Sequence, residues 1–239
     1  MQILLYSSTM KKIVVLTGAG VSAESGINTF RDADGLWEGH DVMEVATPEG
    51  FQKNPELVLH FYNERRKQLF NVLPNAAHKA LARLEEHFDV DVITQNVDDL
   101  HERAGSSNVI HLHGELLKAR CSYNPNKIID WKADMKIGDL SEDGRQLRPH
   151  IVWFGEEVPL LEKAANITKA AQILIIIGTS MQVYPAASLI HYANKDTPIY
   201  FIDPKPNISP TYVDRLTIIR ASAALGVPQL VVDLINKKR

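Results

Sequence analysis

The sequence predicts an α/β fold: a Rossmann-like parallel sheet with helices on both faces, plus a small inserted module. Short apolar runs rich in β-branched residues recur along the 239-residue chain, as expected for strands buried on both faces. Helical patterns lie between several of these runs, which favours parallel strands joined by helical crossovers. Two stretches, 28–71 and 118–149, break the alternation and predict the inserted module.

The first predicted strand is Lys12–Thr17 (KIVVLT), a nearly continuous apolar run that leads into glycines. Similar runs follow at Asp91–Thr94, Val109–Leu112, Ile173–Gly178, Ile199–Ile202 and Leu216–Ile219. Between them, Asn75 is a candidate N-cap for AAHKALARLEEHF, which carries an apolar stripe. We also expect helices at Glu157–Ala171 and Pro185–Tyr192.

The module combines two segments of different character. In the first, Asn54 is expected to cap a helix that has Pro55 at its first position. The second, 118–149, shows little periodicity and many turn residues. We therefore assign 32–71 and 118–149 to the module. The segments 1–31, 72–117 and 150–239 form the Rossmann-like domain.

Composition places the chain in the ordinary globular class, with 45% hydrophobic and 23% charged residues. A formal net charge of -3 gives no electrostatic reason to expect nucleic acid or an anionic membrane as a partner. The single cysteine, Cys121, excludes an internal disulfide and suits a reducing compartment. No secretory signal or membrane-spanning run is evident, and the first nine residues resemble an extension before Met10. We expect a cytoplasmic monomer.

A glycine pattern directly follows the first strand. Residues 18–23 (GAGVSA) fit G-x-G-x-x-A, which allows a tight turn and close backbone approach to a pyrophosphate. Alone the pattern is weak, because a plain tight turn explains it equally well. Dehydrogenases also carry an acid about 20 residues further on, at a strand end, whereas this chain has the polar loop EGHD there.

A better candidate for the ribose-binding acid is Asp203, which closes the strand Ile199–Ile202. Its alternative role is to cap the loop before Pro204. Gly178-Thr179-Ser180 offers a second small-residue turn after another buried strand. Ligands of such sheets bind beyond the carboxyl ends of the strands, so these turns are expected to line one crevice.

Polar side chains follow two further strands: Gln95, Asn96 and Asp98 after one, and His111 and His113 on the next. Taken singly, Asp98 could be only an N-cap, and a strand histidine is more often structural than catalytic. Together they place an amide, a carboxylate and an imidazole beside the glycine turns.

These residues belong to five motifs that resemble those of the sirtuin family. The motifs are GAGVSAESGINTFR (18–31), TQNVDDLHERAG (94–105), HLHG (111–114), VWFGE (152–156) and GTS (178–180). They occur in order and span most of the chain. The resemblance implies a Rossmann domain, a small module, and an acyl-lysine tunnel between them.

The resemblance also implies roles for individual residues. Those expected to bind NAD are Gly18, Ala19, Gly20, Ser22, Phe30, Arg31, Gln95, Asn96, Asp98, Gly178, Thr179, Ser180, Asp203 and Ala223. Those expected to bind substrate are Ala46, Tyr62, Arg65, Val152, Trp153, Phe154 and Gly155. Of these, Val152 to Gly155 would pair with an extended acyl-lysine protein or peptide as an added strand.

The implied activity is NAD-dependent lysine deacylation, with His113 as general base and Asn96 and Asp98 beside the nicotinamide ribose. In the implied mechanism the acyl oxygen attacks ribose C1′, nicotinamide leaves, and His113 assists a ribose hydroxyl. The products would be free lysine, nicotinamide and O-acyl-ADP-ribose. An imidazole suits the role because its pKa lies near neutrality.

The acyl group is indicated by Tyr62 and Arg65, which lie three residues apart on one helix face. By pattern alone they read as a core residue and a solvated charge. The resemblance favours another role, because a sirtuin subgroup uses such a pair to bind the carboxylate of succinyl- or malonyl-lysine. Ala46 resembles the small residue of that wider pocket. We expect desuccinylase and demalonylase activity alongside deacetylation.

The chain departs from most sirtuins at the zinc site. CSYN stands where the first C-x-x-C is expected, and Cys121 is the only cysteine. A structural zinc needs four ligands, so no metal is predicted. The module is expected to be held by apolar packing instead, through Ile128, Ile129, Trp131, Ile137, Leu140 and Leu147.

Three other activities compete with deacylation. Mono-ADP-ribosyl transfer breaks the same first bond, so dependence of nicotinamide release on acyl-lysine separates the two. A non-catalytic NAD sensor would not need Asn96, Asp98 and His113 together. A dehydrogenase would form NADH without any acyl peptide.

Overall fold

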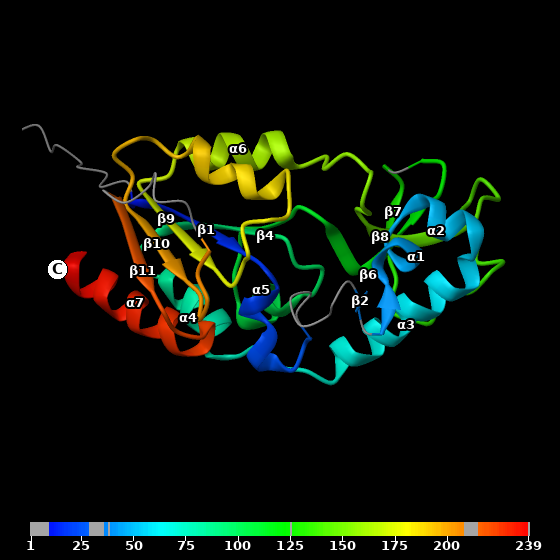
Figure 1. Ribbon diagram of the computed structural model, residues 1–239, viewed down its shortest axis with the longest axis horizontal. Coiled ribbons are helices and arrows are strands. Elements are labelled where there is room, and N and C mark those ends of the chain that lie inside the picture. Colours follow the sequence, from blue (N-terminus) through cyan, green and yellow to red (C-terminus); the bar gives the residue numbers. More distant parts are fainter. Residues whose placement is uncertain (1–9, 29–35, 38, 125, 208–214, 239) are drawn as a thin grey trace, which may run out of the picture.

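In the computed structural model, six parallel strands form the main sheet, in the order β11-β10-β9-β1-β4-β5 (Figure 1). The structure describes residues 10–28, 36–37, 39–124, 126–207 and 215–238. The strands are β1 (Lys12–Thr17), β4 (Asp89–Thr94), β5 (Val109–His111), β9 (Ile173–Ile177), β10 (Ile199–Ile202) and β11 (Leu216–Ile219). All six predicted strands are thereby confirmed, to within two residues at each end.

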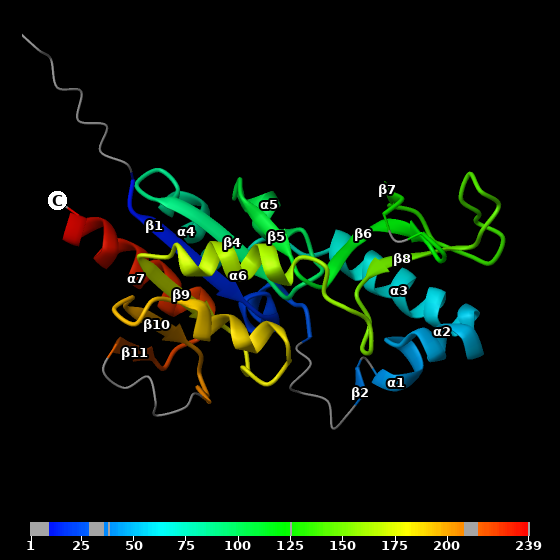
Figure 2. The ribbon, with the colours of Figure 1, turned by 90° about the horizontal axis from the view of Figure 1, so that it is seen from above.

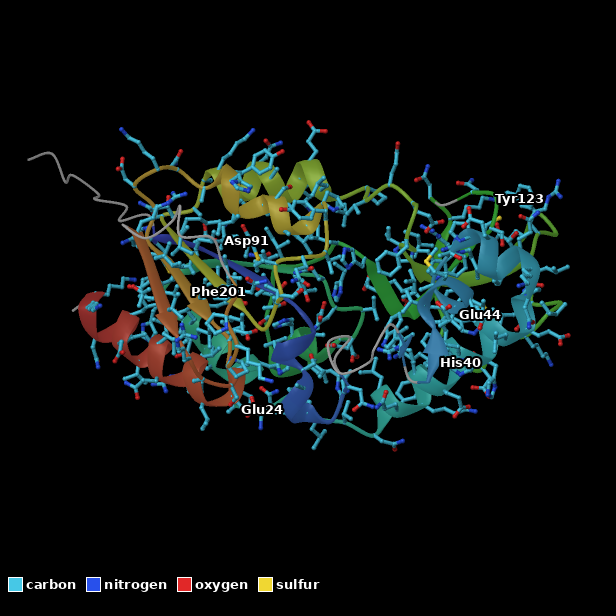
Figure 3. The ribbon with its side chains drawn as sticks, in the orientation of Figure 1. Glu24, His40, Glu44, Asp91, Tyr123 and Phe201 are labelled. Carbon is cyan, nitrogen blue, oxygen red and sulfur yellow. The ribbon has the colours of Figure 1, made fainter. Side chains whose placement is uncertain are left out.

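Helices cover both faces of this sheet, as predicted. Helices α4 (Ala76–Leu84) and α7 (Ala223–Lys238) pack on one face. Helix α6 (Leu161–Lys169) and the 3₁₀ helix η4 (Ala186–Tyr192) pack on the other. Figure 1 shows α6 above the sheet and α4 and α7 below it, and Phe201, labelled in Figure 3, is fully buried on the α6 side.

Three observations bear on the predicted helices: a cap, an additional helix and a helix type. The Asn75 cap is confirmed, because its side chain accepts from the Ala77 N–H at 2.9 Å. Helix α7 was not predicted, although its buried residues recur at helical spacing and Pro228 lies in its second turn. The segment 185–192 is a 3₁₀ helix rather than an α-helix.

The chain order of the strands fixes where a ligand can bind. From β1 the chain continues to β4 on one side of the sheet, and β9 later pairs on the other side. The strand order therefore reverses beside β1, and the carboxyl ends of β1, β4 and β9 open a crevice there. The turns η1 (Ala19–Val21) and η2 (Ala23–Ser25) and helix α5 (Leu100–Ala104) follow these ends.

The remaining elements form a second part at the far end of the molecule's long axis from α7 (Figures 1 and 2). Its antiparallel sheet, ordered β7-β6-β8, contains β6 (Gly114–Cys121), β7 (Ile128–Asp130) and β8 (Leu147–Ile151). Its other elements are β2 (Leu36–Trp37), β3 (His40–Asp41), α1 (Val42–Val45), α2 (Pro48–Lys53) and α3 (Pro55–Phe70). The expected cap of α3 is confirmed by the bond from Leu57 N–H to Asn54 Oδ1, 3.1 Å. The three strands at 114–151 were not predicted, and the two-part division of the chain stays a proposal.

The predicted apolar packing of this part is largely wrong. Four of the six proposed residues are exposed, with exposed fractions of 44–54%: Ile128, Ile129, Ile137 and Leu140. The reason for the two in β7 is topological, because β7 is an edge strand and neither of its faces is covered. Leu147 is buried as expected, and it packs with Leu59, Ala119 and Met135, against which Trp131 also lies.

Buried hydrogen bonds also hold this part together. The Asn63 side chain on α3 both donates to the Met135 carbonyl and accepts from the Met135 N–H, at 2.8 Å each. Arg66, almost fully buried, donates to the Leu116 carbonyl of β6. These bonds tie Met135 and strand β6 to α3.

The described residues contain neither a group of metal-ligating side chains nor a membrane-spanning helix. There, no group of three or more His, Cys, Asp or Glu side chains is placed to hold a metal ion, and the absence of zinc stays a prediction. None of the helices in that same part of the chain has the length and apolarity needed to cross a bilayer.

Candidate functional site

Two glycine turns meet at the carboxyl edge of the main sheet. The Gly20 N–H donates to the Gly178 carbonyl at 2.8 Å. A Cβ on Gly20 would lie 2.6 Å from the Gly178 Cα, so no larger residue fits. Gly178 itself has a φ of +59°, which favours glycine. This close approach joins two turns of the protein, and the Gly20 N–H is already bonded to the Gly178 carbonyl. The predicted approach to a pyrophosphate stays a prediction.

Ser22, Asn96 and Asp98 form one buried hydrogen-bonded cluster behind the first turn. The Ser22 hydroxyl donates to Asp98 Oδ2 at 3.0 Å and accepts from Asn96 Nδ2 at 3.1 Å. Asp98 Oδ1 also accepts from the Leu100 N–H, although the N-cap residue of α5 is Asp99 rather than Asp98. Burial raises the pKa of Asp98, which hydrogen bonds from Leu100 and Ser22 partly oppose. The cluster holds the Asn96 amide in a fixed orientation.

His113 lies where a neutral base is needed. Its Nδ1 is 3.0 Å from the Gln95 carbonyl oxygen. A carbonyl can only accept, so Nδ1 carries the hydrogen and the neutral ring has its lone pair on Nε2. Burial lowers the pKa of His113, and the Gln95 carbonyl only partly offsets this. The ring is therefore neutral near pH 7, with Nε2 able to accept a proton.

His111, two residues earlier, has the opposite character. Its Nδ1 faces the Asn96 carbonyl at 3.0 Å, and its Nε2 faces the Glu102 carboxylate at 2.7 Å. Burial disfavours its charged form, but Glu102 and the Asn96 carbonyl outweigh burial and raise the pKa of His111. The two histidines of the HLHG motif therefore differ: the pKa of His111 is raised by its partners, and the pKa of His113 is lowered by burial.

The second turn and the last strands bring further predicted residues to the same edge. Gln95 Nε2 donates to Thr179 Oγ1 at 3.1 Å, which joins the ends of β4 and β9. Ser180 follows directly. Asp203 is buried at the end of β10 and accepts from the Lys205 N–H at 2.8 Å. Its loop-capping role is confirmed, and its ribose-binding role stays a prediction.

Three predicted cofactor residues remain: Ala223, Phe30 and Arg31. Ala223 begins α7, and the adjacent Ser222 and Ala224 both donate to the Glu24 carboxylate. Figure 3 shows Glu24 at this end of α7. Phe30 and Arg31 fall outside the described residues.

The predicted acyl pair lies in the second part of the molecule. Tyr62 has no exposed surface, and Arg65 is 8% exposed. The Arg65 guanidinium lies over the Trp37 ring, 4.2 Å from its centroid. Ala46 is also buried, and its carbonyl accepts from the Phe154 N–H at 3.0 Å. The expectation that Arg65 is a solvated charge is therefore wrong, because aromatic rings cover it.

The predicted substrate strand is a turn in this structure. Strand β8 ends at Ile151, and Gly155 has a φ of +88°. The Val152 N–H donates to the His113 carbonyl at 2.9 Å, which connects this segment to the candidate base. The Trp153 N–H donates to Glu156 Oε2 and the Phe154 N–H to the Ala46 carbonyl, so three N–H groups of this segment are already used. Added-strand pairing here stays a prediction.

Two buried polar residues beneath the site, His78 and His101, were not predicted. His78 Nε2 lies 3.4 Å from Ser22 Oγ, and His101 Nε2 lies 3.1 Å from Thr17 Oγ1. Burial lowers the pKa of His78 to about 4. A signal existed for His78, because it stands three residues before Leu81 on the apolar stripe of α4.

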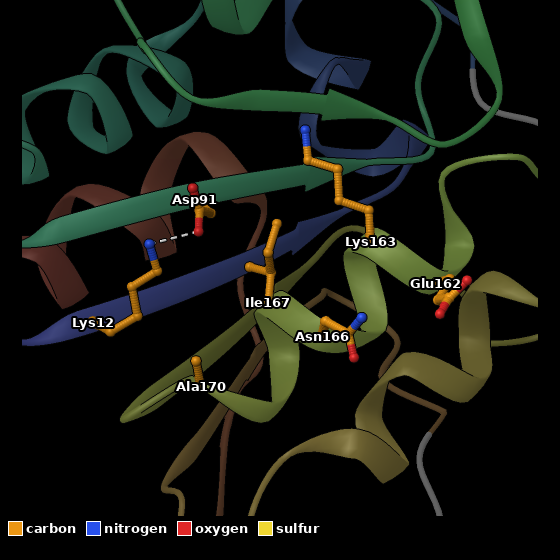
Figure 4. Close-up of a pocket in the computed structure, with 7 residues that line it drawn as sticks. All are labelled: Lys12, Asp91, Glu162, Lys163, Asn166, Ile167 and Ala170. Carbon is orange, nitrogen blue, oxygen red and sulfur yellow. Dashed lines mark ion pairs between the residues drawn. The ribbon is translucent and has the colours of Figure 1, made fainter.

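A pocket of about 630 Å³ opens elsewhere, between α6 and the start of β1 (Figure 4). Lys12 bonds to Asp91 within it, at 2.6 Å, and Lys163 and Glu162 line it from α6. It lies at the amino ends of the strands, away from the glycine turns. We therefore do not assign it to this site.

Comparison with known proteins agrees with this geometry. Residues 18–185 match the model of the Sir2 family. An NAD-dependent protein deacylase of Helicobacter pylori is 66% identical over 196 residues, covering 82% of this chain and 84% of that protein. An NAD-dependent protein deacylase of Bacteroides thetaiotaomicron is 56% identical over 228 residues, covering 92% of this chain and 97% of the relative.

Solved structures show the same fold. A Sir2 homologue in complex with NAD aligns with a TM-score of 0.83 at 42% identity, covering 96% of this chain and 91% of that one. A Sir2 protein bound to an acetylated peptide aligns with a TM-score of 0.75 at 29% identity, covering 96% and 94%.

Proposed function

The chain belongs to the Sir2 family of NAD-dependent protein deacylases, and from this premise we propose that it removes both acetyl and carboxylate-bearing acyl groups from lysine side chains. The observation that carries the acidic preference is the buried Tyr62–Arg65 pair on α3. The expected acidic groups are succinyl and malonyl. A solved relative that binds an acetylated peptide supports acyl-lysine as the substrate class.

The residues at the sheet edge suit a dinucleotide. The two glycine turns pack against each other at this edge, and buried hydroxyl, amide and carboxyl groups of Ser22, Asn96 and Asp98 adjoin them. We propose that these residues, with Gln95, Thr179 and Asp203, hold NAD. When bound, NAD would supply the ribose carbon that takes the acyl oxygen; with one water consumed, the products would be nicotinamide, free lysine and O-acyl-ADP-ribose.

His113 is the proposed general base. Its Nδ1 is held by the Gln95 carbonyl, which directs the Nε2 lone pair away from β4 and leaves it to accept a proton. The Val152 N–H bonds to the His113 carbonyl and so links the base to the proposed substrate segment.

Activity should persist to acidic pH. The base works when neutral, and burial lowers the pKa of His113, so its protonation should reduce kcat/KM only below the ordinary histidine pKa of about 6.5. A pH profile of kcat/KM with an acetyl-lysine peptide should show activity falling as the pH drops, with the midpoint below that value. A midpoint above it would contradict the proposed environment of the base.

Arg65 is expected to decide the acyl preference. Its guanidinium can donate two parallel hydrogen bonds to a carboxylate, which an acetyl group lacks. Replacing Arg65→Met should lower the ratio of succinyl to acetyl kcat/KM by about tenfold or more, since a buried charge-assisted bond contributes about 1.5–3 kcal/mol. Peptides that differ only in the acyl group, followed by mass spectrometry, measure this ratio.

The matched control for this test is Lys67→Met, which removes an exposed positive charge from the same helix. It should leave the ratio unchanged. Equal losses of both activities in Arg65→Met would refute the acidic preference. Nicotinamide release that does not require an acyl peptide would point instead to ADP-ribosyl transfer.

Other expectations stay proposals. They are a monomeric state, a cytoplasmic location, and the absence of nucleic-acid and membrane partners.

A further inference from the structure

Trp153 makes a buried contact with Tyr62 that the proposed function does not yet use. The two residues are 91 positions apart, and Trp153 Nε1 lies 2.9 Å from the Tyr62 hydroxyl oxygen. Trp153 is only 2% exposed and Tyr62 is fully covered. Water therefore does not compete for this bond.

The direction of this hydrogen bond is fixed by chemistry. An indole nitrogen can only donate, so the Tyr62 oxygen is the acceptor. The Tyr62 hydrogen must then point away from Trp153. Burial raises the pKa of Tyr62, so the hydroxyl keeps its hydrogen. Among the residues that the structure describes, no acceptor for that hydrogen is found.

Trp153 is itself held rigidly from several sides. The Arg148 guanidinium lies over its ring, 3.2 Å from the centroid. Its backbone N–H donates to Glu156 Oε2 at 2.8 Å, and Arg148 is bonded to the same carboxylate. The Phe51 ring packs against it at 5.3 Å between centroids. The indole N–H therefore has little freedom to turn from Tyr62.

The Tyr62 hydroxyl and the Arg65 guanidinium belong to one cluster of side chains. The two side chains lie three residues apart on α3 and share the Phe61 and Trp37 rings as neighbours. A carboxylate has enough acceptor sites for both donors. Because Tyr62 is covered, an acyl group can reach it only after the surrounding side chains shift.

We propose that Trp153 is a positioning residue for acyl specificity: its indole N–H occupies one acceptor site of Tyr62 and so turns the Tyr62 O–H towards the carboxylate of a bound succinyl- or malonyl-lysine. The inference rests on the proposed function. It adds that acyl specificity depends on the orientation of the Tyr62 hydroxyl hydrogen. Trp153, which is distant from Tyr62 in the sequence, sets this orientation. The accepted bond also polarises the hydroxyl and strengthens its donation.

A double-mutant cycle tests the proposal, with the ratio of succinyl to acetyl kcat/KM as the readout, so that any loss common to both substrates cancels. Trp153→Phe should lower this ratio about three- to tenfold, mainly through the KM for the succinyl peptide, because a charge-assisted donor is no longer oriented. Tyr62→Phe should lower it by about tenfold. In the double variant the ratio should match that of Tyr62→Phe within twofold, because Trp153 acts through the hydroxyl.

The control is Phe51→Leu, which removes a ring contact from Trp153 and leaves the indole N–H in place. It should leave the ratio unchanged within twofold. An unchanged ratio in Trp153→Phe, or losses that multiply in the double variant, would overturn the proposal. Failure of this proposal can be distinguished from failure of the proposed function. If the proposed function fails, Arg65→Met will also leave the ratio of succinyl to acetyl kcat/KM unchanged.

A second measurement does not depend on the folding of any variant. The chain has three tryptophans, so the indole N–H signals in a ¹⁵N spectrum of the wild-type protein can be resolved. A succinyl-lysine peptide should shift the Trp153 signal more than an acetyl-lysine peptide does, because donation to a carboxylate makes the Tyr62 oxygen a better acceptor. Equal shifts with both peptides would overturn the proposal.

Discussion

Replacing His113→Asn is expected to lower deacylation by about 10²- to 10⁴-fold, the usual contribution of a general base. Asparagine can keep the bond to the Gln95 carbonyl that Nδ1 makes in the wild type. It cannot replace Nε2, which is the atom proposed to take the proton. The loss should appear in kcat/KM with acetyl- and succinyl-lysine peptides alike, measured by mass spectrometry of the products.

A measurement of NAD binding distinguishes loss of the general base from loss of the cofactor site. Calorimetry should give His113→Asn an affinity for NAD close to that of the wild type, because the glycine turns are untouched. His60→Asn, an exposed histidine on α3, serves as the control and should retain full activity. Retention of more than a fifth of the activity in His113→Asn would rule out the base.

Of the substitutions proposed for this protein, Glu156→Gln is expected to lower the free energy of unfolding the most. The Glu156 carboxylate bonds to Arg148 at 2.7 Å and to Arg120 at 2.8 Å, and both guanidinium groups are at least 92% buried. Removal of one partner from a buried ion pair leaves an uncompensated charge, which costs about 3–5 kcal/mol. Glu156 keeps some exposure, so we expect about 3 kcal/mol, or a melting temperature lower by about 6–12 °C.

The pH dependence of this effect provides an internal check. Burial acts to raise the pKa of Glu156, but the arginines outweigh burial and lower it. Its contribution to stability is therefore present above the unfolded-state pKa of about 4.5 and is lost as the pH falls through the lower folded-state value. The difference in unfolding free energy between wild type and Glu156→Gln should shrink below pH 4. Glu157→Gln, an exposed neighbour, should change the melting temperature by less than 2 °C.

Most of the main sheet could be predicted because its signals are local. Lys12–Thr17 and the five later strands are short runs of buried, β-branched residues, and Asn54 and Asn75 are caps beside the helices they begin. Such features depend on covalent geometry and neighbouring residues. The three strands at 114–151 have no clean alternation of polar and apolar residues, because β7 is exposed on both faces, and they could not be predicted.

The residues of the candidate site were predicted by motif, but their protonation states and hydrogen-bond directions were not. The sequence by itself placed two histidines in HLHG and a Tyr–Arg pair on one helix. Tertiary structure alone decided that Glu102 raises the pKa of His111, that the Gln95 carbonyl fixes the tautomer of His113, and that Trp153 donates to the Tyr62 hydroxyl. The physical reason is that protonation and hydrogen-bond direction depend on burial and on specific partners, and folding brings those partners together from distant parts of the chain.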